Sequence, residues 1–306
     1  MTQPRRGTQR GAAIVIAMLL AAFAAVVAAG VLADQQRWTR NVEHRRDAVQ
    51  AQATAMAGVQ WARQILYDDA RTSVIDHLGE PWALQLPPIP LDNGEIRGAI
   101  ADAQSRLNVN ALGDDAAAVE RMRLARLFAQ RGGPVAALDS IADWIDRDSA
   151  TRAGGAEDAW YRAQTVPMLA ANAPVLRVAE IATVRNVSYE ALAAVRPYIT
   201  ALPPRTPLNV NTAPAEVLAA VLDNASPEAL AAIISGRKEK PYTTVAEFRA
   251  RLPQGVHLSS EEMLDVRSGY FEVTVEARQG ASTARARALV HREADRWPSI
   301  VWQVVE

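Results

Sequence analysis

The sequence of 306 residues contains no cysteine and only four histidines. The lack of cysteine excludes disulfide bonds, thiolate nucleophiles, zinc–thiolate sites and iron–sulfur clusters. No Gly-x-Ser-x-Gly elbow, His-Glu-x-x-His helix or phosphate-binding glycine loop is present. The carboxylate pairs Asp68-Asp69 and Glu261-Glu262 fit solvated charge on exposed helices better than an acid and a base. The residues therefore give little support to a catalytic function.

Neither sign of charge dominates the chain. It has 33 lysines and arginines against 34 aspartates and glutamates, and its net charge is -1. A protein that binds nucleic acid through phosphates usually shows a basic excess, so no nucleic acid partner is expected over the whole chain. The hydrophobic content of 49% is enough for one large domain or two ordinary ones.

A long apolar segment stands near the amino terminus. From Ala12 to Ala33 the chain carries no charged side chain, and as a helix this segment is about 33 Å long, which spans a bilayer. Arg5, Arg6 and Arg10 precede it without an acidic residue, so the positive-inside rule predicts a cytoplasmic amino terminus. A secretory signal cleaved before Asp34 is the rival interpretation, but signal cores run to about 7 to 15 apolar residues.

The helix is predicted to continue beyond the membrane segment. Between Asp34 and Tyr67 there is no proline. An apolar stripe recurs at helical spacing over this stretch and consists of Trp38, Val42, Val49, Ala53 and Met56. Such a stripe indicates either packing against the globular part or a surface for a partner helix, and both can hold.

The rest of the chain divides into irregular, helical and strand-like parts. Glu80–Gly94 is rich in proline and predicts an irregular connection that ends in a turn, and Glu95–Asp102 predicts a short strand. Helical patterns follow in Asn108–Ala171 and Pro214–Arg251. Gly269–His291 alternates apolar and polar residues around a turn at Gln279-Gly280, which predicts a β-hairpin.

An acidic loop in the middle of the chain invites comparison with a calcium site. If Asp146 is position 1 of an EF-hand loop, Asp148 is position 3 and Glu157 is position 12. Positions 5 and 6 are Ala150 and Thr151, where an oxygen ligand and a glycine belong, so the loop is not an EF-hand. A solvated acidic loop that caps a helix remains the plainer interpretation.

The stretch Thr206–Gly255 has the helical spacing of a helix-hairpin-helix DNA-binding module. Its connection Asp223–Pro227 lacks the glycine that such a hairpin uses to approach phosphate. Its basic residues, Arg237, Lys238, Lys240, Arg249 and Arg251, are balanced by Glu216, Asp223, Glu228, Glu239 and Glu247. We therefore expect a packing unit, in which Asn209 and Asn211 satisfy local backbone groups and Thr212 caps a helix that opens at Pro214. A membrane-anchored DNA-binding protein and a periplasmic enzyme with a signal anchor remain as alternatives.

Several motifs resemble those of one family. They are the run Arg10-Gly11-Ala12-Ala13-Ile14-Val15-Ile16, DHLGEPWA at 76–83, SRLNVNAL at 105–112, DWIDRD at 143–148, GAEDAWY at 155–161, TPLNVNTAPAEVLAAV at 206–221 and SGYFEVTVEARQG at 268–280. Together they cover nearly the whole chain from Gly11 onward. The chain is similar to the K-type minor pseudopilins of type II secretion systems, which are membrane-anchored assembly proteins and not enzymes.

The resemblance implies how the amino terminus is processed. Prepilin peptidase would cut after Gly11, and Ala12 would become the methylated first residue of the mature protein. Most pseudopilins carry a glutamate at mature position five, where this chain has Ile16. In the K type this departure fits a subunit at the filament tip, with no subunit above it, and an unpaired carboxylate in the bilayer would cost several kcal/mol.

The resemblance also implies an α+β fold, in which a long N-terminal transmembrane helix leads to a pseudopilin α/β domain with a large inserted α-helical domain. The expected segments are a leader at 1–11, a membrane part at 12–33, the first part of the α/β domain at 34–104, the insertion at 105–260 and C-terminal strands at 261–306. The expected partners are the I- and J-type minor pseudopilins in a tip complex at the inner membrane. Calcium is expected near the acidic loop, with candidate ligands Asp143, Asp146, Asp148, Glu157 and Asp158.

Overall fold

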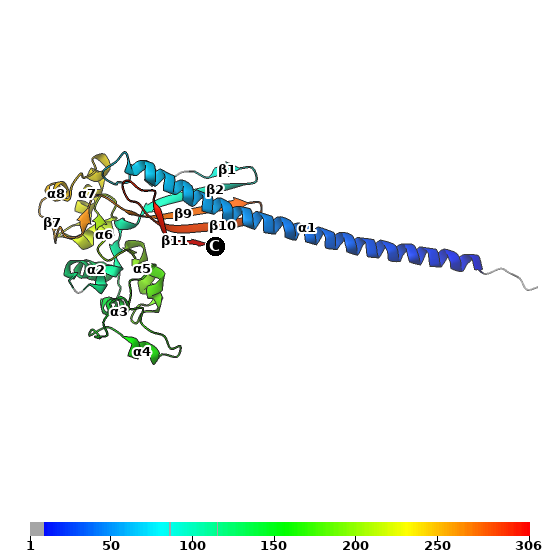
Figure 1. The fold of residues 1–306 in the computed structure, drawn as a ribbon, viewed down its shortest axis with the longest axis horizontal. Coiled ribbons are helices and arrows are strands. Elements are labelled where there is room, and N and C mark those ends of the chain that lie inside the picture. Colours follow the sequence, from blue (N-terminus) through cyan, green and yellow to red (C-terminus); the bar gives the residue numbers. More distant parts are fainter. Residues whose placement is uncertain (1–8, 86, 115) are drawn as a thin grey trace, which may run out of the picture.

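A single long helix projects from a body made of two parts (Figure 1). The computed structural model describes residues 9–85, 87–114 and 116–306. Helix α1, Gln9–Ala70, has 62 residues and is therefore roughly 90 Å long. The prediction that one helix continues from the apolar segment to the body is confirmed. Most of the expected leader, including Arg5 and Arg6, lies outside the described residues.

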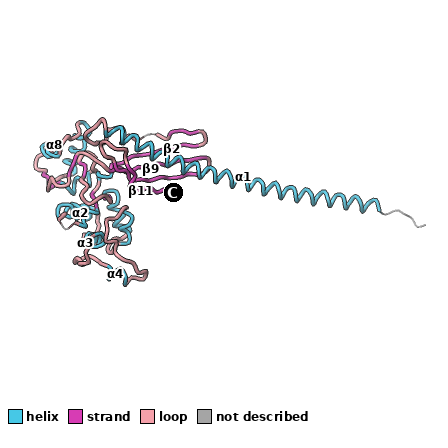
Figure 2. The backbone as a smooth tube through the Cα atoms, in the orientation of Figure 1, coloured by secondary structure: helices cyan, strands magenta, loops and turns pink. Residues whose placement is uncertain are grey.

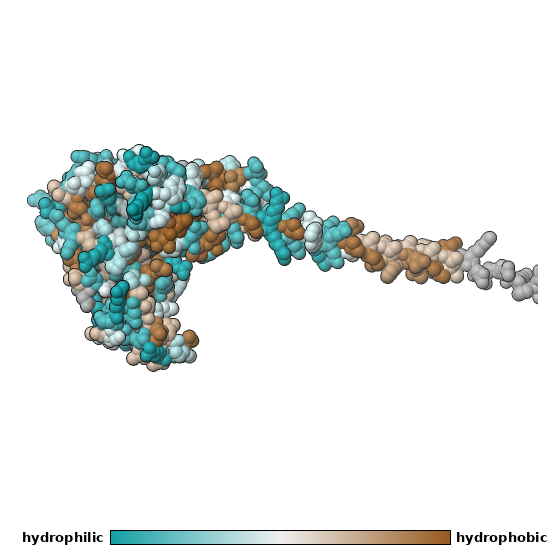
Figure 3. Space-filling model, in the orientation of Figure 1, coloured by the Kyte–Doolittle hydropathy of each residue, from teal (hydrophilic) through white to brown (hydrophobic). Residues whose placement is uncertain are grey.

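Helix α1 is apolar at the end remote from the body. Within the described residues it contains the one segment that is long and apolar enough to cross a membrane. Figure 3 shows brown and tan surface along this outer half, and teal surface where the helix approaches the body. The apolar half makes no contact with the body, so it is free to lie in a bilayer.

The inner half of α1 packs on one face of a five-stranded sheet with the order β1-β2-β9-β10-β11. Figure 2 shows these strands gathered beside α1. All neighbouring strands in this sheet are antiparallel. The strands are β1, Ile89–Leu91; β2, Gly94–Asp102; β9, Tyr270–Gln279; β10, Ser282–His291; and β11, Ser299–Val305.

The predicted hairpin is confirmed as β9 and β10, which pair from Gln279–Ser282 to Tyr270–His291. Side chains alternate between the faces of a strand, and the burial of β9 follows this alternation, with Phe271 and Val273 buried against α1. Gly58 permits close packing here, because a Cβ at that position would lie 2.6 Å from Cγ1 of Val275. Gly280 supplies the turn at a φ of +54°.

The strand β2 confirms the prediction for Glu95–Asp102, but β1 was expected to be irregular. All three residues of β1 are exposed, so the strand shows no alternation of apolar and polar residues. Pro90, which has no N–H group, is tolerated because β1 lies at the edge of the sheet.

A large helical block lies between β2 and β9 in the sequence, although these two strands are neighbours in the sheet. The chain therefore leaves the sheet at Asp102 and returns to the adjacent strand at Tyr270. The block lies at the end of the molecule away from the apolar half of α1 (Figure 1). Its apolar core is separate from the core between α1 and the sheet and reaches from Leu107 to Val266.

The helical block confirms the helical patterns in the sequence and adds short strands between them. Its α-helices are α2, Ala118–Gln130; α3, Ala136–Ile145; α4, Asp158–Arg162; α5, Tyr189–Val195; α6, Ala215–Val221; α7, Pro227–Glu239; and α8, Val245–Ala250. Short 3₁₀ helices are η1, Pro81–Ala83, before the block, and η2, Ala103–Ser105; η3, Val109–Gly113; η4, Val178–Thr183; and η5, Arg196–Tyr198, within it. Its paired strands are β3, Leu107–Asn108, with β4, Ile199–Thr200; β5, Leu208–Asn209, with β8, Leu264–Asp265; and β6, Leu222–Asp223, with β7, His257–Leu258.

The apolar stripe of α1 does not pack on the body. Trp38, Val42, Val49 and Met56 are 70%, 45%, 66% and 43% exposed. The buried face of the helix is formed instead by Ala51, Ala55, Val59, Ala62 and Leu66. Packing against the globular part, the first interpretation of the stripe, is therefore wrong, because the sheet is covered by a face that consists mostly of alanine.

Candidate functional site

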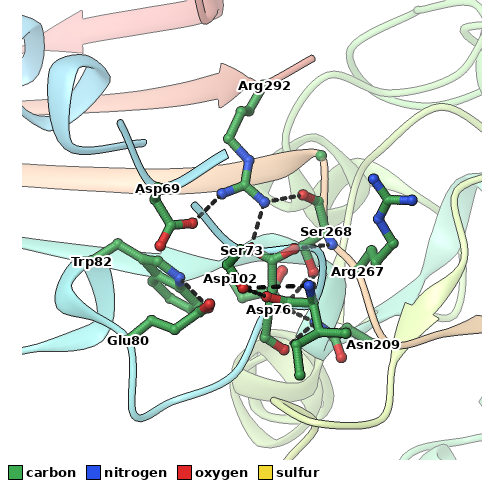
Figure 4. A network of polar contacts seen from close by, with 12 residues as sticks. Asp69, Ser73, Asp76, Glu80, Trp82, Asp102, Asn209, Arg267, Ser268 and Arg292 are labelled. Atoms are coloured by element: carbon green, nitrogen blue, oxygen red, sulfur yellow. Dashed lines mark hydrogen bonds and ion pairs between the residues drawn. The ribbon is translucent and has the colours of Figure 1, made fainter. Parts of the chain in front are cut away.

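A buried polar network joins α1, the sheet and the helical block (Figure 4). The guanidinium of Arg292, which follows β10, donates to the carboxylate of Asp69 of α1 at 2.5 Å and to that of Asp76, and it also donates to the backbone carbonyl of Ser268 at 2.8 Å. The side chains of Arg292, Asp69 and Asp76 are 8%, 5% and 4% exposed. The interpretation of Asp68-Asp69 as solvated charge is therefore wrong for Asp69.

Asp102, the last residue of β2, is the second centre of this network. One carboxylate oxygen accepts from the hydroxyls of Thr212 at 2.5 Å and Ser268 at 2.7 Å, and from the side-chain amide of Asn209 at 3.2 Å. The other oxygen accepts from the backbone N–H of Gln104 at 2.7 Å. These hydrogen bonds offset part of the cost of burying the carboxylate of Asp102.

Of the roles predicted for this region, that of Thr212 is wrong and that of Asn209 is confirmed but incomplete. Thr212 does not cap a helix, because its hydroxyl binds Asp102 and the residue before α6 is Pro214. Asn209 does satisfy a local backbone group, since its Oδ1 accepts from the N–H of Asn211 at 2.9 Å, but its side-chain amide also donates to the distant carbonyl of Asp76 at 3.1 Å. Both residues connect the block to segments that are distant in the sequence. Such contacts cannot be predicted from the neighbouring residues alone.

Burial raises the pKa values of two carboxyl groups in this network. It raises the pKa of Asp69 from 3.8 to about 6, with a further contribution from Glu80, while Arg292 acts in the opposite direction. Burial likewise raises the pKa of Asp102 to about 6, against the hydrogen bonds from Thr212 and Ser268. Protonation of these carboxylates is therefore easier in the folded than in the unfolded chain.

The acidic loop between α3 and α4 brings three of the five candidate calcium ligands together. Carboxylate oxygens of Asp146, Asp148 and Glu157 lie within 4.8 Å of one another. Oδ1 of Asp146 and Oε1 of Glu157 are buried and accept no hydrogen bond from the described residues. The other oxygen of Asp146, Oδ2, is paired with the guanidinium of Arg152. The two buried oxygens without partners suit a hard cation, so these residues fit calcium.

The other two candidates, Asp143 and Asp158, each have hydrogen-bond partners. Asp143 is fully buried and accepts from the backbone N–H of Arg152 at 3.1 Å and from its guanidinium at 2.7 Å. Asp158 accepts from the backbone N–H of Ala170 at 3.0 Å and pairs with Arg162 at 2.9 Å. Neither belongs to the close group of three oxygens, although both are near enough to affect its charge.

The clustering of carboxylates has an electrostatic consequence. Burial raises the pKa of Glu157 from 4.5 to about 7, and the negative charges of Asp143, Asp146, Asp148 and Asp158 add to the shift. Burial also raises the pKa of Asp146. A divalent cation would remove the repulsion that causes part of these shifts.

The stretch considered as a DNA-binding module uses its arginines inside the fold. Arg237 is buried and donates to the carbonyl of Val210 at 2.8 Å. Arg251 donates to the carbonyls of Lys240 at 2.9 Å and Gly236 at 3.1 Å, and its guanidinium lies over the ring of Tyr242. Groups with internal partners are poor anchors for phosphate, which favours the packing unit.

The residues of the expected processing site lie on the outer end of α1. Gly11, Ala12 and Ile16 are all exposed, and Ile16 has an exposed fraction of 57%. A side chain added at Gly11 would meet nothing within 4 Å. The fold leaves this end of the helix open to another molecule.

Known proteins are similar to this chain in sequence and in fold. Two family profiles, both described as "Type II secretion system (T2SS), protein K", match residues 105–204 and 208–267. The type II secretion system protein K of Pseudomonas aeruginosa is 31% identical over 90% of this chain and 86% of its own length. That of Aeromonas hydrophila is 28% identical over 94% of both chains.

A solved structure described as the GspK-GspI-GspJ complex of enterotoxigenic Escherichia coli contains a chain with the same fold. Its TM-score is 0.75 at 24% identity, and the likeness covers 88% of this chain and 99% of that chain. A long helix with an apolar outer half and an inner half packed on an antiparallel sheet, together with the matched profiles, defines a pseudopilin component of type II secretion. The chain belongs to the protein K family of that system. The resemblance and the α+β fold class are thereby confirmed.

The raised pKa of Asp69 predicts how stability depends on pH. Because the folded-state pKa of about 6 exceeds the ordinary value of 3.8, the contribution of Asp69 is fully present below pH 3.8 and is lost as pH rises through about 6. Asp69→Asn should remove a pH-dependent change of about 3 kcal/mol in the free energy of unfolding. Urea unfolding of the full chain in detergent at several pH values measures it.

Asp68→Asn is the matched control, because Asp68 is the exposed neighbour in the sequence. It should keep the wild-type pH profile. An Asp69→Asn profile as steep as that of the wild type would contradict the assignment.

Proposed function

We propose that this chain is the minor pseudopilin at the tip of the periplasmic pseudopilus and helps to initiate its assembly for protein export across the outer membrane. The observation that carries the proposal is the helical block, which lies at the end of the molecule opposite the apolar half of α1 (Figure 1). In a filament built on parallel α1 helices, a block at this end would cover the tip. Ile16 supports the same position, because a tip subunit has no neighbour above it to pair with a buried carboxylate. The role is structural and not catalytic.

The partners proposed are the I- and J-type minor pseudopilins. Support comes from the solved structure with this fold, which is described as the GspK-GspI-GspJ complex. It also comes from the exposed stripe Trp38, Val42, Val49 and Met56, which is apolar and makes no contact with the body. A second helix would bury this stripe by ridge-and-groove packing.

The amino terminus is proposed to be cytoplasmic, with the body in the periplasm. Prepilin peptidase would then meet Gly11 and Ala12 at the cytoplasmic side of the inner membrane. The exposed outer end of α1 supports access to this bond.

Processing at Gly11 is testable by mass spectrometry of the membrane fraction from a host that has prepilin peptidase. The wild-type protein should begin at methylated Ala12. Gly11→Val should retain the leader in nearly all molecules, because the enzyme must accommodate the residue at the cut.

Gly30→Val is the matched control, since an added side chain at Gly30 also meets nothing within 4 Å. This variant should be processed normally. A mature protein that begins at Asp34, or Gly11→Val cut like the wild type, would overturn the processing assignment.

The proposed helix contact is tested by Val49→Glu. Burial of an unpaired carboxylate is costly, so recovery of the I- and J-type partners with the tagged full chain should fall at least about tenfold. Gln50→Glu changes the adjacent exposed residue, which lies off the stripe, and should leave recovery unchanged. Equal recovery with Val49→Glu would show that the stripe is not the contact.

We also propose that the acidic loop binds calcium through Asp146, Asp148 and Glu157. The cation would satisfy the two buried oxygens without hydrogen-bond partners and hold the connection between α3 and α4. Calcium competes with the proton on Glu157, so binding should tighten as pH rises through about 7.

Calorimetric titration of the full chain with calcium measures this binding. At a calcium concentration of about 100 times the dissociation constant, the folded state should gain about 2.7 kcal/mol. Glu157→Gln should weaken binding strongly and flatten its pH dependence.

Asp158→Asn is the control, because the residue has partners outside the close group and an amide oxygen can still accept from Ala170. It should bind calcium almost as well as the wild type. Equal binding by Glu157→Gln would place the cation elsewhere.

A further inference from the structure

A wide groove separates the sheet from part of the helical block. Its volume is about 760 Å³. One wall is the face of the sheet that carries Glu272, Arg287, Leu289 and Trp302, and the other is formed within residues 176–201. Neither the acidic loop nor the buried polar network contributes to it.

The groove lies on the face of the sheet opposite α1. Neighbouring side chains on a strand point to opposite faces, and Phe271, Val273 and Ala288 pack against α1. Glu272 and Leu289 therefore face away from the helix. A molecule in the groove would not compete with a helix bound along the stripe of α1.

The walls carry more positive than negative charge. Arg106, Arg177, Arg196 and Arg287 face the groove, against the carboxylates of Glu272 and Glu306. Arg106 is already engaged, since it donates to Glu272 at 2.8 Å. Among the described residues Arg196 and Arg287 have no ion pair and no side-chain hydrogen bond, and Arg287 is half-buried. A partly desolvated guanidinium without an acceptor favours a carboxylate ligand.

Apolar side chains stand between these charges. Leu192 and Leu289 are buried in the walls, while Leu176 and Tyr189 are 61% and 83% exposed beside them. Isolated charges separated by apolar surface are typical of sites that hold a peptide.

We propose that this groove binds an extended acidic segment of a partner protein, with carboxylates on Arg287 and Arg196 and neutral side chains against the leucines. A nucleic acid fits less well, because Glu272 and Glu306 would repel a continuous row of phosphates. A membrane surface fits less well because the groove belongs to the body, remote from the apolar half of α1 (Figure 3). This inference goes beyond the tip position and does not depend on it.

The test uses fluorescence anisotropy with the full chain in detergent. The probe is a fluorescein-labelled decapeptide of alternating glutamate and alanine, compared with the same peptide of lysine and alanine. The acidic peptide should bind, the basic one should not, and added salt should weaken the binding. Arg287→Ala should weaken it at least about tenfold, the effect expected from the loss of one charge-assisted contact.

Arg196→Ala is the second variant, and because Arg196 is exposed its removal leaves the fold intact. It should also weaken binding. Arg205→Ala is the matched control, since Arg205 is 85% exposed and does not line the groove. Its affinity should equal that of the wild type.

Three outcomes would overturn the proposal. The acidic peptide could fail to bind, its affinity could be unchanged in both Arg287→Ala and Arg196→Ala, or the basic peptide could bind as tightly as the acidic one. Tighter binding of a DNA oligomer or of anionic lipid vesicles, lost in Arg287→Ala, would instead assign the groove to general polyanions and would also reject it.

Discussion

The buried contacts of Arg292 and Asp102 hold the parts of this molecule in one arrangement. Arg292 brings together the end of α1, the loop after it and the segment before β9, while Asp102 binds the interior of the helical block through Thr212 and its end through Ser268. Burying these charges is costly, and the arrangement is stable only because nearly every oxygen has a donor. Loss of one partner would leave an uncompensated charge, so the network specifies a unique junction more than it adds stability.

This junction explains how a large block can be inserted into a small sheet. The block enters after Asp102 and leaves before Tyr270, and β2 and β9 are adjacent antiparallel strands. The two ends of the block are therefore close together, and the sheet pairs as it would around a short turn. The cores on either side are separate, so each part can pack by itself.

The sequence predicts the long, periodic elements well and the junction poorly. The helix α1 and the hairpin of β9 and β10 carry strong periodicity, which reflects burial of one face. The strand β1 has no buried face, so it shows no alternation of apolar and polar residues. Pro90 is also more typical of a loop than of a strand. Asn209 and Thr212 were assigned local roles because their partners lie more than 100 residues away in the sequence. The sequence shows that the stripe of α1 is apolar. The spacing of its residues does not indicate whether the body or another molecule covers the stripe.

The length of α1 has a mechanical consequence. The helix runs without a break from Gln9 to Ala70, and Asp69 in its last turn forms an ion pair with Arg292. A continuous hydrogen-bonded helix is stiff along its axis, so a pull or push on its apolar end reaches the body almost undiminished. If the whole helix moves along its axis by the rise of one residue, which is about 1.5 Å, the body moves by the same distance. The inner half of α1 is packed along the sheet from Ala51 to Leu66, and the ion pair of Asp69 with Arg292 adds a further contact at its end.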